Sequence, residues 1–338
     1  MKEYLTYDDV LLEPQYSEIE SRSTIDLQAC LGTYIPWLKI PIIAAPMDTV
    51  CEDDMAIALN RQGGLGIIHR YNSIDEQVEL VQQVKDLGCA VGAAVGTVGN
   101  YLERVHALVQ ADVDVICIDV AHGHHKLVKE AIQNIKKAHP KLHVMAGNIA
   151  SAKAFQDLEE WGANSIRVGV GGGSICSTRL QTGHGVPNLS VIMDCAAVAK
   201  ETKIIADGGI RTSGDMVKAL AAGADFVMVG SMLAGTKESP GEVHIDHKNG
   251  KKYKVYRGMA SREAQTDWRG SSSAPEGISA TVEYKGDLIP LLEDIIGGIK
   301  SGLSYSGAKN LNELRTKAVF VRQTMAGQKE SWTHILSK

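Results

Sequence analysis

The sequence lacks the features that direct a chain to a membrane, to secretion or to nucleic acid. No window holds about 18 uninterrupted apolar residues, the length that a membrane span requires. The start, Met1-Lys2-Glu3-Tyr4-Leu5-Thr6, has no long apolar core, so we expect no signal peptide. Lys and Arg form no basic run, and the formal net charge is -5. We therefore expect neither a membrane nor a nucleic-acid partner.

A disulfide framework is also missing. The six cysteines are widely spaced and contain no CxxC pair: Cys30, Cys51, Cys89, Cys117, Cys176 and Cys195. Cysteines in this pattern are typical of reduced thiols. The sequence thus predicts a cytoplasmic protein whose stability comes from its core, and 44% hydrophobic residues suit a large core.

What the chain does contain is a regular alternation of short apolar runs with amphipathic stretches. Eight runs read as strands buried on both faces: 41–45, 65–69, 90–95, 113–119, 143–147, 165–170, 203–207 and 225–230. Helical patterns cover 73–87, 100–110, 124–139, 152–161, 189–200 and 214–222. Eight β-then-α units predict a closed (β/α)8 barrel, a TIM barrel in the α/β class. An open doubly wound sheet is less favoured, because no Gly-x-Gly-x-x-Gly turn follows the first strand.

Polar and reactive residues stand where the predicted strands end, the edge at which such barrels carry their chemistry. They are Met47, Asp48, His69, Arg70, Asp119, Asn148, Cys176, Thr178, Asp207, Gly230 and Ser231. A rim that served structure alone would not require this set. The sequence therefore predicts a site at this face.

One region departs from the alternation. Residues 236–286 are polar, rich in Gly, Ser and Pro, and show no clear helix, although 246–251 resembles a hairpin. Long irregular insertions usually act as lids or remain disordered. We expect a flap inserted after the eighth strand, then a closing helix over 288–301. The whole chain, 1–338, would be one catalytic domain.

The most informative motif is a glycine-rich loop that ends on a lone thiol, Cys176. Four glycines within five positions let backbone groups approach a ligand or an ion closely: Gly169, Gly171, Gly172 and Gly173. A cysteine on such a loop can act as a nucleophile if its thiolate is stabilised. The alternative is an inert cysteine packed beside a tight turn. The surroundings favour the nucleophile.

Two glycine turns follow the seventh and eighth strands, where barrels commonly bind phosphate. The first is Asp207-Gly208-Gly209 and the second is Gly230-Ser231. Backbone N–H groups there could hold a phosphate, although the glycines could equally serve the turns alone. The Asp207 carboxylate suits a ribose better than a phosphate, since it accepts hydroxyl hydrogens.

Other polar residues allow more than one interpretation. Asp119 ends an apolar run, so its carboxylate needs a partner if it is buried, and Arg167 is the candidate. A functional role for this pair and a purely structural ion pair are equally consistent with the sequence. His122, His124 and His125 lack the acidic or thiol neighbours of a metal site, so we do not favour a metal there. From composition alone, Glu276 reads as a solvated loop carboxylate.

Taken together, these motifs resemble the IMP dehydrogenase / GMP reductase family over nearly the whole chain. The resemblance rests on 5–12 (LTYDDVLL), 45–50 (APMDTV), 119–123 (DVAHG), 146–148 (AGN), 173–179 (GSICSTR), 206–209 (ADGG), 256–259 (YRGM) and 285–287 (KGD). It implies the same TIM barrel, and a thiolate of Cys176 that attacks C2 of a purine mononucleotide. It also implies a nicotinamide cofactor and a homotetramer.

The resemblance assigns roles to the predicted rim. Thr178 and Glu276 would form a proton-transfer pair with Cys176. The substrate-binding positions would be Met47, Ser174, Asp207, Gly208, Gly209, Gly230, Ser231, Tyr256, Arg257, Gly258 and Met259. The cofactor-binding positions would be Asp119, Val120, Ala121, Asn148 and Arg167. Carbonyl groups of Gly171, Gly173 and Cys176 would bind K+.

Two absences favour the GMP reductase branch, which uses NADPH. The regulatory CBS modules that dehydrogenases usually carry after the second strand are missing, and so is the Arg-Tyr pair of their mobile flap. Other stretches, such as Pro275-Glu276-Gly277-Ile278, look more like a dehydrogenase, and Arg269 could replace the flap arginine. IMP dehydrogenase with NAD therefore remains the alternative. A non-catalytic purine-nucleotide sensor is a further one, against which the retained Cys176, Thr178 and Glu276 argue.

Overall fold

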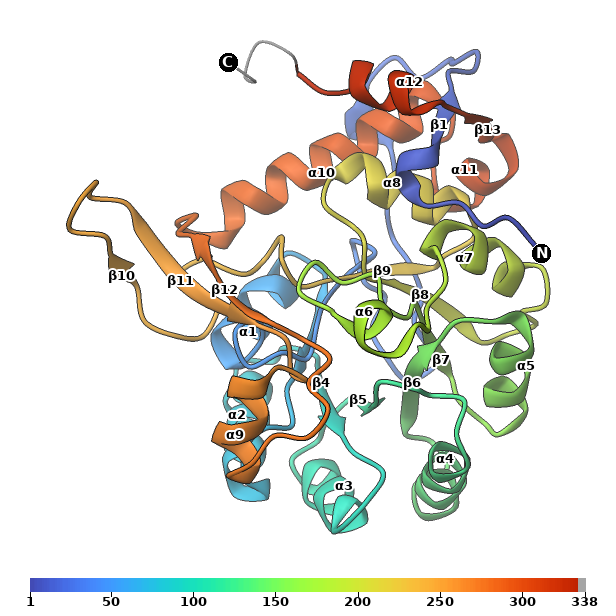
Figure 1. Cartoon of the computed structure of the whole chain (residues 1–338). Coiled ribbons are helices and arrows are strands. Elements are labelled where there is room, and N and C mark those ends of the chain that lie inside the picture. The colour runs from blue at the N-terminus through green and yellow to red at the C-terminus, as the bar shows by residue number, and fades with distance from the viewer. Residues whose placement is uncertain (334–338) are drawn as a thin grey trace.

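The computed structural model describes residues 1–333, and its centre is a closed barrel of eight parallel strands (Figure 1). The barrel strands, in order around the barrel, are β2 (Ile42–Ala44), β3 (Leu65–Ile68), β4 (Val91–Val95), β5 (Val115–Asp119), β6 (His143–Ile149), β7 (Ser165–Val168), β8 (Lys203–Asp207) and β9 (Phe226–Val229). β9 pairs with β2 and closes the ring. The TIM barrel that the sequence predicts is confirmed. Seven of the eight predicted runs contain a whole barrel strand, and the run 143–147 covers all of β6 except its last two residues.

Helices cover the outside of the barrel because each turns an apolar stripe toward the strands. They are α1 (Asp53–Arg61), α2 (Ile74–Asp86), α3 (Tyr101–Gln110), α4 (Lys126–Ala138), α5 (Ala152–Glu160), α7 (Asn188–Ala196), α8 (Ser213–Ala221) and α10 (Leu288–Tyr305). The short helix α6 (Thr178–Thr182) has no buried residue and follows the loop that carries Cys176. Local signals fix where several of them begin. Ser73 and Glu76 form a capping box at α2, and Thr212 and Asp215 form another at α8.

The core has two layers, one between strands and helices and one inside the barrel. The inner layer contains Ile43, Leu65, Ile67, Val115, Cys117, Met145, Ile205, Phe226 and Met228. Leu31, Ile35 and Leu38, from the segment before β2, belong to the same cluster and close the N-terminal end of the barrel. The inside is therefore solid, and a ligand has access only at the opposite end.

The ends of the chain add elements that the sequence did not reveal. The 3-10 helices η1 (Tyr7–Asp9) and η2 (Arg22–Thr24) flank a first strand, β1 (Val10–Glu13). This strand pairs antiparallel with β13 (Val319–Arg322), between α11 (Leu311–Lys317) and α12 (Met325–Glu330). The helix α1 was also not predicted.

The expectation of an irregular insertion without a helix is wrong. Residues 236–286 contain a three-stranded antiparallel sheet, β10 (His244–Ile245), β11 (Lys252–Arg257) and β12 (Ser279–Glu283), and the helix α9 (Arg262–Arg269). Figure 1 shows the sheet as an arm beside the barrel. Only Lys254 and Tyr256 of its strands are buried, so few apolar residues mark it in the sequence. The predicted hairpin at 246–251 is confirmed, since it joins β10 to β11.

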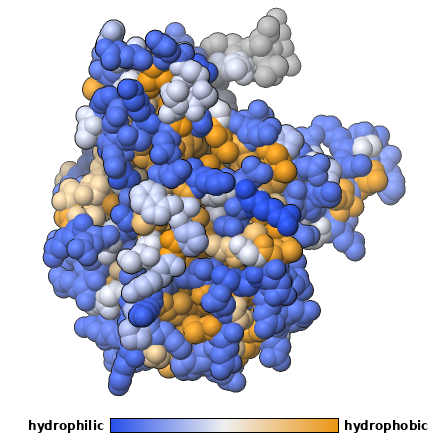
Figure 2. Space-filling model, turned by 180° about the vertical axis from the view of Figure 1, so that it is seen from behind, coloured by the Kyte–Doolittle hydropathy of each residue, from blue (hydrophilic) through white to orange (hydrophobic). Residues whose placement is uncertain are grey.

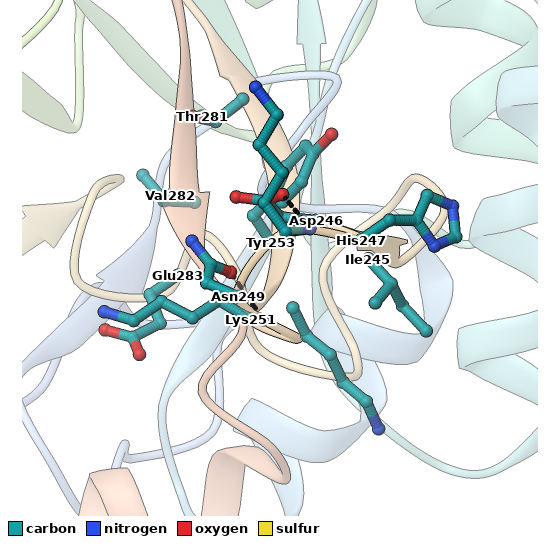
Figure 3. Close-up of a pocket in the computed structure, with 11 residues that line it drawn as sticks. Ile245, Asp246, His247, Asn249, Lys251, Tyr253, Thr281, Val282 and Glu283 are labelled. Atoms are coloured by element: carbon teal, nitrogen blue, oxygen red, sulfur yellow. Dashed lines mark hydrogen bonds between the residues drawn. The ribbon is translucent and has the colours of Figure 1, made fainter.

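A hollow of about 720 Å³ lies on this hairpin (Figure 3). It is larger than the pocket beside Cys176, but its polar groups serve the turn itself. Asp246 Oδ1 accepts from the Lys248 amide at 2.9 Å, and Asn249 Oδ1 from the Lys251 amide at 2.8 Å. No cysteine and no buried charged residue line the hollow, and we assign no site to it.

The surface seen from behind is mostly hydrophilic, with separate apolar groups among the charged ones (Figure 2). Within residues 1–333, no helix combines the length and the apolar character needed to cross a bilayer.

Candidate active site

A pocket of about 420 Å³ opens at the C-terminal ends of the barrel strands. Residues from the ends of six strands (β2, β3, β5, β6, β7 and β8) line it, together with the turn after β11 and residues of α9. Its lining includes the predicted residues Met47, Asp119, Val120, Ala121, Asn148, Arg167, Gly171, Gly173, Cys176, Thr178, Asp207, Gly208, Tyr256, Gly258, Met259 and Glu276. The fold thus brings most of the predicted site residues into one cavity.

Three side chains form a hydrogen-bonded line inside this pocket. The Cys176 thiol is exposed and donates to Thr178 Oγ1 at 3.2 Å. Thr178 Oγ1 in turn donates to Glu276 Oε2 at 2.7 Å. A proton can move along this line from sulfur to carboxylate while the Thr178 hydroxyl gives one proton and takes another.

Backbone hydrogen bonds place Glu276 near the thiol, although Glu276 lies 98 residues after Thr178 in the chain. The Ser177 amide donates to the Glu276 carbonyl at 2.8 Å, and the Ile278 amide donates to the Ile175 carbonyl at 3.0 Å. Glu276 is therefore not the solvated loop carboxylate that composition suggests. Backbone hydrogen bonds hold the segment that carries it against the cysteine loop.

Arg167 organises the charges at the floor of the pocket. It is 6% exposed and donates to Asp119 Oδ1 at 2.6 Å and to Asp207 Oδ2 at 2.9 and 3.1 Å. Burial would lower the pKa of this guanidinium, but the carboxylates of Asp207 and Asp119 outweigh burial and raise it. Burial would likewise raise the pKa of Asp119, but Arg167 and Arg70 hold it below its ordinary value. The predicted Asp119–Arg167 contact is confirmed.

The same network orients Asp207. Its Oδ2 also accepts from Asn148 Nδ2 at 2.8 Å, while its Oδ1 has no hydrogen-bond partner within residues 1–333. One oxygen is fixed and the other stays available to hydroxyl donors. Asp207 is thus held as a fixed acceptor at the end of β8.

A second group of predicted residues surrounds Tyr256, which is 5% exposed. Burial raises the pKa of its phenol, and the hydroxyls of Ser174 and Ser231 oppose this effect. A Cβ on Gly230 would lie 3.1 Å from both the Tyr256 hydroxyl and Met47 Sδ. A glycine here keeps the backbone next to the phenol open.

Arg257 lies at the edge of this group and does not line the pocket itself. It donates to Asp48 Oδ2 at 2.7 and 3.0 Å and to Asp267 at 2.5 Å. It therefore ties α9 to the barrel. Gly209 lies beyond the pocket too, where a Cβ would be 3.6 Å from Tyr7.

The cation ligands predicted on the cysteine loop are backbone carbonyl oxygens. The Gly173 carbonyl accepts from the Cys176 amide at 3.1 Å, which keeps the loop tightly turned. The φ of Gly171 is +79°, and a Cβ there would lie 2.5 Å from Arg179. In the part of the chain that the structure describes, no three His, Cys, Asp or Glu side chains gather as metal ligands. Neutral carbonyl oxygens of this loop suit a monovalent cation better than a transition metal.

One wall of the pocket is formed by α9 and the β3 exit, and the sequence analysis identified it only in part: it named Arg70 and Arg269 but missed Tyr71, Gln265 and Ser273. Tyr71, Gln265, Arg269 and Ser273 line it, together with Arg70. The Tyr71 and Trp268 rings stack at 5.6 Å with 12° between their planes. Among the described residues, Arg70 Nε is buried without a hydrogen-bond partner, and it lies 3.6 Å from Asp119 Oδ2. The aromatic residue in an otherwise polar helix is the one sequence signal that could have revealed this wall.

The three histidines after β5 serve local structure. His125 caps α4 by accepting from the Leu127 amide, and His124 contacts Asp157 at 2.8 Å. Burial lowers the pKa of His122, and the neighbouring histidines lower it further.

Comparisons with known proteins agree with this geometry. Residues 4–334 match the model of the IMP dehydrogenase / GMP reductase domain. The chain is 36% identical to an inosine-5'-monophosphate dehydrogenase of Nitrosopumilus maritimus over 98% of both chains. It is 35% identical to a GMP reductase of Leishmania major, over 100% of this chain and 98% of the relative.

A solved structure matches as well. It is a variant of the GMP reductase of Trypanosoma brucei in complex with guanosine 5'-monophosphate, with a TM-score of 0.93 and 32% sequence identity. The match covers 99% of this chain and 98% of that one. The alignments with the two relatives above span 471 and 486 positions, against 338 residues in this chain. Relatives of both names therefore carry extra residues inside the aligned region, so their absence here does not separate the two activities.

Proposed function

The chain belongs to the IMP dehydrogenase / GMP reductase family, and from that premise we propose that it is a GMP reductase. Members of the family are oxidoreductases that act on purine nucleotides with NAD(P)H. In the proposed reaction GMP, NADPH and two protons give IMP, NADP+ and ammonium. The observation that carries the proposal is the line from Cys176 through Thr178 to Glu276, beside the charged floor of the pocket.

The first half of the reaction uses this line directly. The thiol proton passes through Thr178 to Glu276, and the Cys176 thiolate attacks C2 of the purine. The C–N bond to the 2-amino group then breaks. The same pair returns a proton to the departing nitrogen, which leaves as ammonia and takes its second proton from solvent. Cys176 remains bonded to C2.

The second half replaces sulfur by hydrogen at C2. A bound nicotinamide cofactor would supply the hydride to C2, after which the C–S bond would break and release IMP and the Cys176 thiolate. Asp119, Arg167 and Asn148 form the floor on which a nicotinamide ring would rest, with Val120 and Ala121 beside it. The unpaired Arg70 Nε fits such a group, since a carboxamide oxygen could accept from it.

Nucleotide binding is proposed for the residues around Tyr256 and Asp207. Asp207 Oδ1 would accept from a ribose hydroxyl. Backbone N–H groups of Gly208, Gly209, Gly230 and Ser231, with the hydroxyls of Ser174 and Tyr256, would hold the phosphate. Met47, Gly258 and Met259 would contact the base, and Arg257 would hold the wall behind it.

The choice of reductase rests on what covers the pocket. A dehydrogenase must activate a water to release its product. The Arg-Tyr pair that carries out this task on the flap of dehydrogenases is absent from the sequence. In its place α9 is fastened to the barrel through Arg257–Asp267 and Tyr71–Trp268. Without a base for water, hydrolysis should slow by about 10²- to 10⁴-fold.

IMP dehydrogenase is the second candidate, and one observation favours it. Arg269 lines the same pocket as Cys176 and has no carboxylate partner in the described chain. An unpaired guanidinium near the thiol could take the place of the missing flap arginine.

Three further properties are part of the proposal. The chain acts as one catalytic domain without CBS modules, with 236–286 as a flap over the pocket. K+ binds carbonyl oxygens of Gly171, Gly173 and Cys176 and orders the cysteine loop. The protein works as a cytoplasmic homotetramer.

The test is a four-way assay with GMP or IMP and each nicotinamide pair, in potassium buffer. We expect GMP to consume NADPH, followed as loss of the near-ultraviolet absorbance of the reduced nicotinamide, and to release ammonia in equal amount. NADH formation from IMP and NAD, with no consumption from GMP, would instead assign the dehydrogenase. Binding without turnover in any combination would assign the sensor.

A further inference from the structure

Asn188, the first residue of α7, lies where the nucleophile loop meets the nucleotide-binding turn. Its side chain is 4% exposed, and Nδ2 donates to the Asp207 carbonyl at 3.0 Å and to the Gly208 carbonyl at 2.6 Å. Two carbonyl acceptors at this atom require the nitrogen there, so the orientation of the amide is fixed.

The same amide group lies against the cysteine loop. A Cβ on Gly172 would lie 2.7 Å from Asn188 Nδ2, and one on Gly169 would lie 3.0 Å from it. Asp207 and Gly208 are also in close contact with this loop, because a Cβ on Gly208 would lie 3.1 Å from the Gly173 amide. One carboxamide therefore sets the distance between two loops that carry the proposed chemistry.

We propose that Asn188 is a positioning residue that holds the Cys176 loop and the Asp207–Gly209 turn in register. The inference rests on the proposed function only for the choice of substrate, because both candidate activities use the two loops. A displacement of about 1 Å between reacting groups can cost about 10²-fold in rate.

The structure explains why this role needs an amide and a glycine together. Gly172 has no positive φ, so its backbone would accept an alanine. What excludes a side chain there is the space that Asn188 fills. Behind the pair lies a cavity of about 180 Å³, toward which Tyr7 and Arg179 also turn. Within residues 1–333 the Tyr7 hydroxyl and Asn188 Oδ1 are buried without hydrogen-bond partners, and the cavity leaves room for a slightly longer amide.

The first part of the test replaces the amide. Asn188→Ala and Asn188→Asp remove the two donors, and the second variant keeps the side-chain size. We expect kcat to fall about 10- to 100-fold in both, with the larger loss for Asn188→Asp, because a carboxylate would face two carbonyl oxygens. Asn188→Gln should recover part of the rate, since it keeps the amide.

The second part is a double-mutant cycle with Gly172→Ala. We expect this change to cost at least 10-fold in kcat in the wild-type background and little in Asn188→Ala, where the space is vacated. Additive losses would overturn the proposal. Because the cycle does not use Asn188→Asp, it still tests the proposal if that variant does not fold.

A readout without turnover separates this inference from the proposed function. The rate at which iodoacetamide alkylates Cys176 should change in Asn188→Ala, whichever reaction the enzyme performs. The control is Asn164→Ala, which removes a side chain that accepts from the Val144 amide at 2.9 Å at the other end of the barrel. It should lower Tm and leave kcat and alkylation unchanged. The same outcome for Asn188→Ala would make Asn188 merely structural and contradict the proposal.

Discussion

At the scale of single residues, the site depends on contacts that no local sequence pattern encodes. The glycine-rich loop identifies Cys176 as reactive, and Thr178 lies two positions further on. Glu276 comes from a polar insertion and could be assigned only through the family resemblance. The structure provides the physical reason, since backbone hydrogen bonds join its segment to the cysteine loop.

The role of Glu276 gives the first prediction. Glu276→Gln keeps a partner for Thr178 but cannot take a proton, so kcat should fall by about 10²- to 10⁴-fold while nucleotide binding persists. Steady-state kinetics and calorimetry with GMP measure the two effects. Glu283→Gln, an exposed change on β12, is the matched control and should behave as wild type. A rate within about two-fold of wild type in Glu276→Gln would remove the proton relay.

The charged floor gives a second prediction at this scale. Arg167→Met removes the guanidinium that holds the pKa of Asp119 below its ordinary value, so this carboxylate should bind a proton more readily. The same change removes two of the hydrogen bonds that orient Asp207. We expect the acidic limb of the kcat/KM profile to move to higher pH and KM for GMP to rise about 10-fold or more. The control is Lys153→Met, at an exposed lysine that pairs with Asp157 on α5, and this variant should leave the pH profile unchanged. An unshifted profile in Arg167→Met would show that the floor does not set these charges.

At the scale of elements, burial decides which strands the sequence reveals. The barrel strands are buried on both faces and read as continuous apolar runs. By contrast β11 and β12 stand in an exposed sheet, and α9 is almost entirely polar. No periodic apolar signal marks these elements, which is why the insertion looked irregular.

The stacking of Trp268 on Tyr71 predicts how α9 behaves. An aromatic pair contributes about 0.5–1.5 kcal/mol, so Trp268→Ala should speed local opening of α9 by about 2- to 12-fold. Hydrogen exchange of the α9 amides, read by mass spectrometry, measures this opening. The overall Tm should change little.

Trp37→Ala, at an exposed tryptophan elsewhere on the surface, is the control and should leave α9 exchange unaltered. If exchange of α9 in Trp268→Ala equals that of wild type, the stack does not fasten the helix.

At the scale of the whole molecule, the two ends of the barrel have different roles. The C-terminal end carries the pocket, and the N-terminal end is closed by apolar residues that contribute to stability. The predicted alternation of strands and helices was sufficient to place the site at the C-terminal end. The sequence did not predict that Leu31, Ile35 and Leu38 close the N-terminal end of the barrel, because these residues lie in a segment without regular structure. There His143 is buried against Ser165 at 2.8 Å, and burial lowers its pKa to about 3.

From the burial of His143 we predict that the free energy of unfolding decreases at acidic pH. The folded protein keeps this ring neutral down to a pH of about 3, whereas the unfolded chain binds a proton below its ordinary pKa of 6.5. Stability should therefore fall as the pH drops through this window, by about 2 kcal/mol between roughly pH 7 and 5. Urea unfolding at the two pH values measures the loss.

The comparison variant is His143→Gln, which carries an amide that does not titrate in this range. Its loss between the same pH values should be smaller than that of wild type by about the same 2 kcal/mol. Equal losses in the two proteins would show that His143 titrates alike in the folded and unfolded states.

The most direct test of the account is the mass of the acid-quenched protein after incubation with GMP alone and with IMP and NAD. We predict that GMP alone yields protein heavier by one GMP less one ammonia, with the added mass on the Cys176 peptide and absent from Cys176→Ser. An adduct formed only from IMP and NAD, or NADPH consumption with GMP that persists in Cys176→Ser, would contradict it.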